Sequence, residues 1–152
     1  MRQKAWVYKE FEIQKFCLIA LSFLSLMGFV KGENMQIIMN VKGAEFVLEL
    51  EDNIATRDFL TLLPLSLEFS DYVGKEKIAP KLPKKLNTAG LNGYTPSVGD
   101  FFYFSPLGNL GIFYEKQPFH SGLVKLGKLD SKALAIIKAQ DSNFVIEFKQ
   151  IN

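Results

Sequence analysis

Residues 94–114, YTPSVGDFFYFSPLGNLGIFY, constrain the fold most, because their turn residues leave two aromatic runs few ways to pair. Pro96 presets its own φ angle, and Gly99 tolerates a positive φ angle just before the first run. Residues 106–109 hold Pro, Gly and Asn and reverse the chain. Residues 110–114 then alternate with a period of two. This pattern predicts two antiparallel strands, and it fixes an architecture without fixing a chemistry.

Similar alternation recurs along the chain at short, even spacing. Five further strands or strand pairs and two helices are expected. The strands are a hairpin over residues 36–41 and 45–50, a strand from Leu65, short strands near Ile78 and Leu86 in a mostly looped segment, a strand over 123–129 and a strand over 144–151. The helices cover residues 54–63, capped by Asn53 and ended by Pro64, and residues 131–139, capped by Asp130 or Ser131. So many short strands need a closed arrangement to hide their edges. The sequence therefore predicts one mainly β domain, a small closed barrel with two short helices.

The N-terminus has the layout of a secretory signal peptide. Residues 16–30 carry no charge and follow four basic side chains, and this apolar run is shorter than the roughly 20 residues of a spanning helix. Gly32 offers a small residue for cleavage. We expect residues 1–32 to direct export to the periplasm or the medium. The alternatives are an uncleaved membrane anchor, or translation from Met35 and a cytoplasmic protein.

Charge and cysteine content exclude several function classes. Residues 35–152 hold thirteen basic and thirteen acidic side chains, so no basic surplus favours nucleic acid. The one local excess, five lysines over residues 75–85, is typical of a solvated loop. The single cysteine, Cys17, lies in the apolar run, which leaves the domain without a disulfide or thiolate chemistry. No cofactor and no metal site is expected.

Four segments in order carry a family resemblance: NIATRDFLTLLPLSLEFSDY, EKIAPKLPKKL, GYTPSVGDFFYFSPLGNLGIFY and SGLVKLGKLD. Together they resemble the small bacterial cyclophilin-like family over residues 35–152. The resemblance implies an eight-stranded barrel capped at its ends by two helices, in a family largely without assigned function. True cyclophilins carry a Phe-His-Arg strand after the first helix, where this chain reads LSLEF. Arg57 matches no catalytic position and is expected to be a solvated or salt-bridged surface residue.

The function that follows is a non-catalytic binding module, with a weak prolyl isomerase as the alternative. His120 is the sole imidazole of the chain, and neither a second histidine nor a GxSxG elbow accompanies it. Acidic pairs such as Glu49 with Glu51 are expected to be solvated. Alternate aromatic residues over 101–104 and 113–114 are expected to fill the barrel. Burial in the core is also the default for those on the other strand face, and the alternative is an exterior groove for an apolar or proline-containing peptide.

The predicted ligand site combines turn backbone, amide, phenol and imidazole groups near those exposed aromatics. It comprises Tyr72, Glu76, Lys77, Asn109, Tyr114 and His120. The expected partner is a peptide, a small molecule or a protein, with no nucleic acid, and with a membrane only if the N-terminal segment stays attached. The alternative is purely structural: Asn109 as a turn residue that tolerates positive φ, Tyr72 as a strand-end cap, and solvated lysines.

Overall fold

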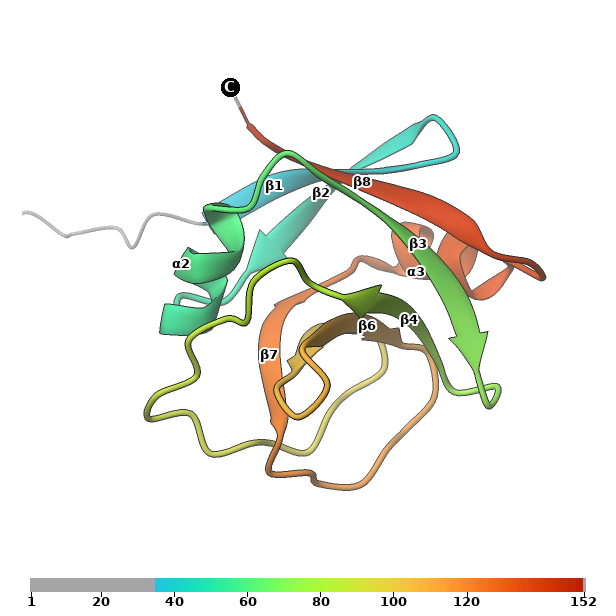
Figure 1. Ribbon diagram of the computed structural model, residues 1–152. Coiled ribbons are helices and arrows are strands. Elements are labelled where there is room, and N and C mark those ends of the chain that lie inside the picture. Colours follow the sequence, from blue (N-terminus) through green and yellow to red (C-terminus); the bar gives the residue numbers. More distant parts are fainter. Residues whose placement is uncertain (1–34, 152) are drawn as a thin grey trace, which may run out of the picture. The chain divides into compact units, whose positions relative to one another are not determined.

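The computed structural model describes residues 35–151 (Figure 1). The elements in chain order are β1 (Met35–Val41), β2 (Ala44–Leu50), α2 (Ile54–Leu60), β3 (Leu65–Tyr72), β4 (Glu76–Lys81), β5 (Asp100–Phe104), β6 (Asn109–Phe113), β7 (Leu123–Lys128), α3 (Ser131–Lys138) and β8 (Phe144–Gln150). No helix among these residues is long and apolar enough to cross a membrane. The predicted signal peptide or anchor over residues 1–32, with Cys17, lies outside the described residues.

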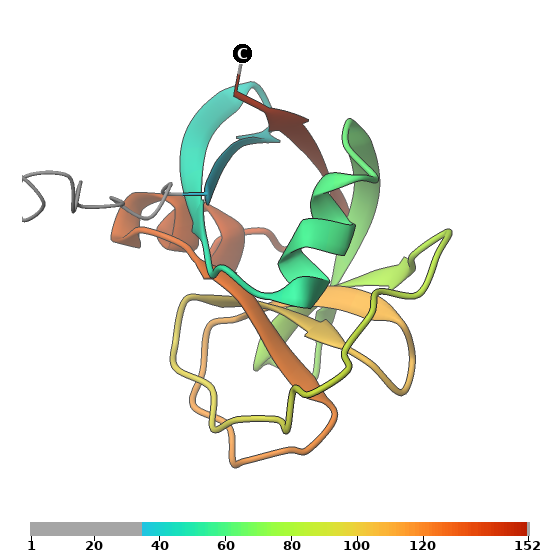
Figure 2. The same ribbon diagram turned by 90° about the vertical axis from the view of Figure 1, so that its left-hand side faces the viewer.

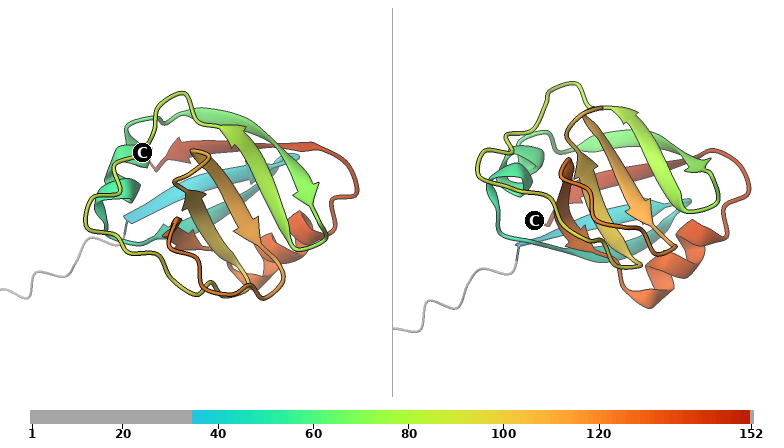
Figure 3. Two further views of the ribbon diagram at one scale, coloured as in Figure 1. Left: turned by 60° about the horizontal axis from the view of Figure 1, so that its bottom comes forward. Right: turned by 90° about the horizontal axis from the view of Figure 1, so that it is seen from below.

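The eight strands form a closed antiparallel barrel in the order β1-β2-β7-β5-β6-β4-β3-β8, as the sequence predicts. Figure 2 looks into one end of this barrel, where α2 lies across the opening. Both views of Figure 3 place α3 at the opposite end. The β2–β7 contact is short, with only Glu49 opposite Lys128 and Leu50 opposite Gly127. Closure pairs β1 with β8 and so removes the free edges that open sheets present.

Alternate side chains of each strand fill the barrel interior. The predicted inward sets are buried in β1, where Ile37, Met39 and Val41 alternate, and in β8 at residues 144, 146 and 148. Phe59 of α2 meets Phe101 and Phe148 edge to face, with ring centroids 5.6 and 5.7 Å apart. The helix thereby closes one end of an aromatic core.

Both helices begin at the predicted caps. The Asn53 side chain accepts a hydrogen bond from the Thr56 backbone N–H at 2.9 Å, and of the two candidates for α3 it is Asp130 that caps the helix. The predicted end of α2 at residue 63 is wrong, because the helix stops at Leu60. Leu62 and Leu63 instead donate to carbonyls three residues back, a tighter turn that avoids the helical conformation disfavoured before Pro64.

One expected strand is absent. The strand predicted near Ile78 exists as β4, but Leu86 lies in the loop that joins β4 to β5. Its backbone N–H donates to the Tyr103 hydroxyl at 3.2 Å, and its side chain is buried. The Tyr103 hydroxyl thus takes the place of a neighbouring strand as the hydrogen-bond partner of the Leu86 backbone. Leu86 is therefore buried without being part of a strand.

Candidate functional site

A second apolar cluster lies on the outer surface of the barrel, over β4, β6, β5 and β7. Phe102, Phe113 and Leu123 point away from the barrel interior and are nevertheless buried, at 2%, 3% and 6% exposure. In the same strand, Phe101 and Tyr103 face inward and join the main core. The two-residue period therefore divides the aromatic run: one set fills the barrel, as the sequence predicts, and the other forms the outer cluster.

This outer cluster forms the floor of a pocket of about 330 Å³, hereafter the outer pocket. That volume lies at the lower end of the range for small-molecule sites. The apolar residues that line it are mainly Ile78, Phe102, Phe104, Phe113, Phe119 and Leu123. Tyr72, Leu107 and Phe119 at its rim are more than half exposed, at 51%, 63% and 57%. Large apolar side chains left open to water around a hollow are typical of a binding surface.

A glycine in the middle of β6 shapes the pocket floor. A Cβ atom at Gly111 would overlap the ring of Phe102, which lies directly over the β6 backbone. That ring stacks on Phe113 with centroids 4.1 Å apart and planes 17° from parallel. The absence of a side chain at this strand position is therefore what lets a flat aromatic floor form.

Two polar atoms in the pocket wall have no hydrogen-bond partner among the described residues. Asn109 is 6% exposed, and its Oδ1 atom is buried and unpaired. The Nε2 atom of Gln117 is in the same state on the loop after β6. Because the great majority of buried polar groups in folded proteins are paired, these two unpaired atoms are exceptions that the contacts of the described residues do not explain.

His120 presents one defined ring nitrogen. Its Nδ1 atom accepts a hydrogen bond from the Gly122 backbone N–H at 2.9 Å, so the ring proton is carried by Nε2. The imidazole meets the Phe104 ring edge to face, with centroids 5.0 Å apart. This contact and the hydrogen bond hold an exposed imidazole at the pocket wall, where it offers an N–H donor.

Glu76 supplies the carboxylate of the pocket. It is the first residue of β4 and lies opposite Phe113 in the ladder with β6. Partial burial raises the pKa of this carboxyl above its usual value. Tyr72, which ends β3, pairs with Glu76 across the β3–β4 hairpin. Four of the six predicted site residues, Tyr72, Glu76, Asn109 and His120, therefore line one pocket.

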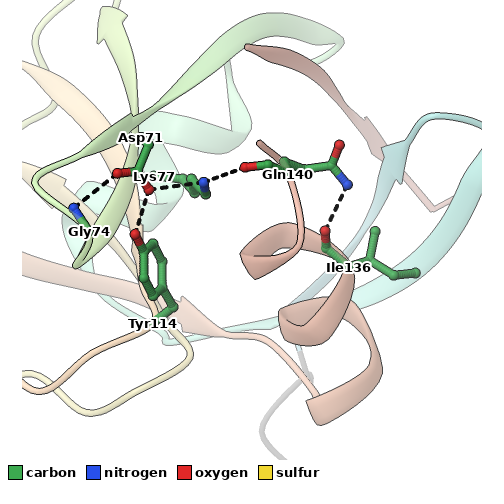
Figure 4. Close-up of polar contacts among 6 residues, drawn as sticks. All are labelled: Asp71, Gly74, Lys77, Tyr114, Ile136 and Gln140. Carbon is green, nitrogen blue, oxygen red and sulfur yellow. Dashed lines mark hydrogen bonds and ion pairs between the residues drawn. The ribbon is translucent and has the colours of Figure 1, made fainter. Parts of the chain in front are cut away.

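The other two predicted residues, Lys77 and Tyr114, belong to a polar cluster outside the pocket lining (Figure 4). Lys77 is 3% exposed, and its Nζ contacts Asp71 Oδ1 at 2.9 Å and the Gln140 carbonyl at 2.7 Å. The Tyr114 hydroxyl donates to the same Asp71 oxygen at 2.5 Å. These contacts join β3, β4 and the chain after β6 to the segment after α3.

The pKa values in this cluster follow from its hydrogen bonds. The Tyr114 hydroxyl, followed by Lys77, lowers the pKa of Asp71 to about 2. Burial, followed by the hydrogen bond to Asp71, raises the pKa of Tyr114 to about 12. Both groups therefore keep one ionisation state over the ordinary pH range, as a fixed structural connection would.

The structure also tests the purely structural roles that the sequence allowed for some of these residues. The positive φ angle of the β5–β6 turn, 75°, is at Gly108, so Asn109 does not serve as the left-handed turn residue. Lys77 is not solvated, whereas Arg57 is an exposed surface residue paired with Asp52 at 2.8 Å, as predicted. Sequence reasoning did not identify Gln117, because it lies in an irregular loop whose residues follow no period.

Comparison with known proteins agrees with this architecture. A sequence model of the Cyclophilin-like family matches residues 39–149. Among solved structures, the chain is similar to the solution structure of the hypothetical protein AF2241 from Archaeoglobus fulgidus, with a TM-score of 0.56 and 15% sequence identity. That likeness covers 82% of this chain and 100% of the other, and at this identity it concerns the fold alone. No curated protein matches the chain.

Proposed function

Because the chain belongs to the Cyclophilin-like family, a barrel family that does not itself define an activity, we propose that the protein is a non-catalytic binding module whose ligand occupies the outer pocket. The ligand is a small molecule or a short peptide segment with an apolar body. Aromatic walls provide most of the contact area, and a few polar groups orient the ligand.

The observation that carries this proposal is the unpaired Oδ1 of Asn109. Leaving a buried amide oxygen without a partner costs about 1–3 kcal/mol, which a purely structural site would avoid by using an apolar residue. A ligand that donates a hydrogen bond there recovers this cost. The unpaired Nε2 of Gln117 adds a donor in the same pocket wall.

The same residues favour binding over chemistry. Of the described residues that line the pocket, Glu76 is the one with a carboxylate and His120 the one with an imidazole, and they come from β4 and from the loop before β7. The Nδ1 atom of His120 is already used by Gly122, which leaves it an N–H donor and not a base toward the pocket. Arg57, the single arginine of residues 35–151, is on the surface of α2 and paired with Asp52.

A fragment titration followed by amide NMR tests the proposal. Benzamide provides an aromatic face together with an N–H donor for Asn109 and a carbonyl for Gln117. We expect shifts limited to β4, β5, β6 with the turn between them, the loop over residues 114–122, and the pocket ends of β3 and β7 at Tyr72 and Leu123. Shifts spread over β1 and β8, or no shifts up to the solubility limit of the fragment, would contradict the proposal.

A proline-isomerisation assay with a short peptide addresses the alternative activity. We expect no acceleration above a heat-denatured control. Acceleration that a Phe104→Ala variant removes, and a Val145→Ala variant on the exposed face of β8 does not, would instead establish the weak isomerase.

A further inference from the structure

Three carboxylates influence the pKa of the Tyr114 phenol, which lies near the place where β3, β4 and the chain after β6 meet. Asp71, Glu115 and Glu76 each act on Tyr114 through their negative charge, after the larger effect of its burial. Two lysines offset part of this negative charge, because Lys77 Nζ and Lys138 Nζ each lie 5.5 Å from the centroid of the Tyr114 ring.

Two of the three acids have a lysine partner. Asp71 pairs with Lys77 at 2.9 Å, and Glu115 pairs with Lys138 at 2.8 Å (Figure 4 shows the first pair). Glu76 has no ion-pair partner within 4 Å among the described residues. It is also the acid of the three that lines the outer pocket. The charge left without a partner is thus the one that a ligand can reach.

Aromatic rings surround this unpaired carboxylate. Tyr72 pairs with Glu76 across the β3–β4 ladder, and Phe113 lies opposite it on β6. Both rings line the pocket, as does Phe119. The faces of such rings attract cations, and a neighbouring carboxylate adds to this attraction. No described lining residue is a lysine or an arginine.

The unpaired groups lie at two ends of the pocket. Glu76 is level with Phe113 in the β4–β6 ladder, whereas Asn109 is four residues farther along β6. At the rise of a β-strand this separates their backbones by about 13 Å. The aromatic floor of Phe102 and Phe113 begins at the Glu76 end, and Phe104 lies opposite Asn109. An occupant that uses both ends has to be elongated.

We propose that the outer pocket binds a small organic amine, with its ammonium group beside Glu76 and its apolar body along Phe113, Phe102 and Phe104 toward Asn109. This inference rests on the proposed function, because it names the ligand class of the same pocket. Charge complementarity carries it: the pocket offers one carboxylate without a partner, several ring faces and no competing lysine. A volume of about 330 Å³ accommodates a molecule of this class.

Three probes of similar shape test the inference: 4-phenylbutylamine, 4-phenylbutanol and 4-phenylbutyrate, which are cationic, neutral and anionic near neutral pH. Dissociation constants are measured by amide NMR titration at low ionic strength, because salt screens a partly exposed ion pair. We expect the amine to bind at least about tenfold tighter than the alcohol, and the anion to bind most weakly.

The variant Glu76→Gln keeps the shape of the side chain and removes its charge. We expect it to bring the affinity for the amine down to that for the alcohol, while the affinity for the alcohol stays within about twofold. The control, Glu45→Gln, removes the same charge from an exposed position of β2, which is four strands away from β4 in the barrel order. It should leave all three affinities unchanged.

Each outcome has one meaning. Equal affinity for amine and alcohol in the unmodified protein overturns the amine inference and leaves a neutral-ligand pocket. A preference for the anion overturns it too and indicates an anionic ligand. A preference for the amine that Glu76→Gln does not reduce overturns it as well. Failure of all three probes to shift any signal of the pocket overturns the inference, and combined with a negative benzamide titration it overturns the proposed function.

Discussion

Replacing Asn109 with leucine should make the protein more stable and a poorer binder. Asn109 is 6% exposed, and its unpaired Oδ1 costs the folded state about 1–3 kcal/mol. Leucine has a similar size and needs no partner, so we expect a gain of about 1–2 kcal/mol. For a domain of about 120 residues the unfolding entropy is about 0.25 kcal/mol per kelvin, which converts this gain into a Tm higher by about 4–8 °C.

Thermal unfolding followed by circular dichroism, together with benzamide titration, checks both halves of this prediction. Loss of one neutral hydrogen bond should weaken binding about fivefold. The matched control is Asn53→Leu, because the Asn53 side chain accepts from Thr56 and donates to the Lys125 carbonyl. That change should lower stability by about 1–2 kcal/mol. If Asn109→Leu also lowers the Tm, the amide has a structural partner and the reasoning is refuted.

Four further predictions concern the polar cluster, a strained turn and the N-terminus. The Asp71 pKa of about 2 is lower than in the unfolded chain. The contribution of Asp71 to stability is therefore complete above about pH 4 and should be lost as the pH falls toward 2. Urea unfolding of the Asp71→Asn variant should not show this loss. At neutral pH, Asp71→Asn should lower the free energy of unfolding more than Lys77→Met does. Asp71→Asn leaves a buried ammonium without its carboxylate, whereas the Asp71 side chain is 43% exposed and can be solvated when Lys77 is removed. Equal losses of stability would argue against this account. Val73 has a φ angle of 48°, which is unfavourable for a β-branched residue. Val73→Gly should therefore raise the free energy of unfolding by about 0.5–1 kcal/mol, whereas Val73→Ala should not. A gain from alanine would show that the exposed side chain, and not the backbone conformation, is the cause. Mass spectrometry of the native protein should find a start near residue 33; an intact N-terminus in a membrane fraction would indicate an anchor, and a start at Met35 a cytoplasmic protein.

The barrel could be predicted because its strands alternate regularly. In β1 and β8 the buried residues alternate with more exposed ones, and a strand with one buried face has one acceptable register. Turn residues then limit where strands end: Gly108, with its positive φ angle, allows the reversal between β5 and β6. Local signals of this kind operate within a few residues, so they can be read without knowing the tertiary contacts.

The candidate site could be predicted only in part, because it depends on which strand face each residue takes. Glu76 and Lys77 are neighbours in β4, so their side chains point to opposite sides of the sheet. Placing both in one site conflicts with the alternation that predicted the strand. Tyr114 follows the last residue of β6 and turns toward Asp71, a contact between residues 43 positions apart that no local pattern encodes.

Alternation also gives the two faces of one hairpin different surroundings. On one side of β4, Lys77 is neutralised by Asp71 and bonded to the Gln140 carbonyl, so the barrel wall is fixed to the segment after α3. On the other side, Glu76 faces the outer pocket without a partner among the described residues. Since Asp71 already has two donors in Lys77 and Tyr114, neither donor is available to Glu76. The polar cluster of Asp71, Lys77 and Tyr114 is therefore complete without Glu76, whose carboxylate is left unpaired, as the proposed amine site requires.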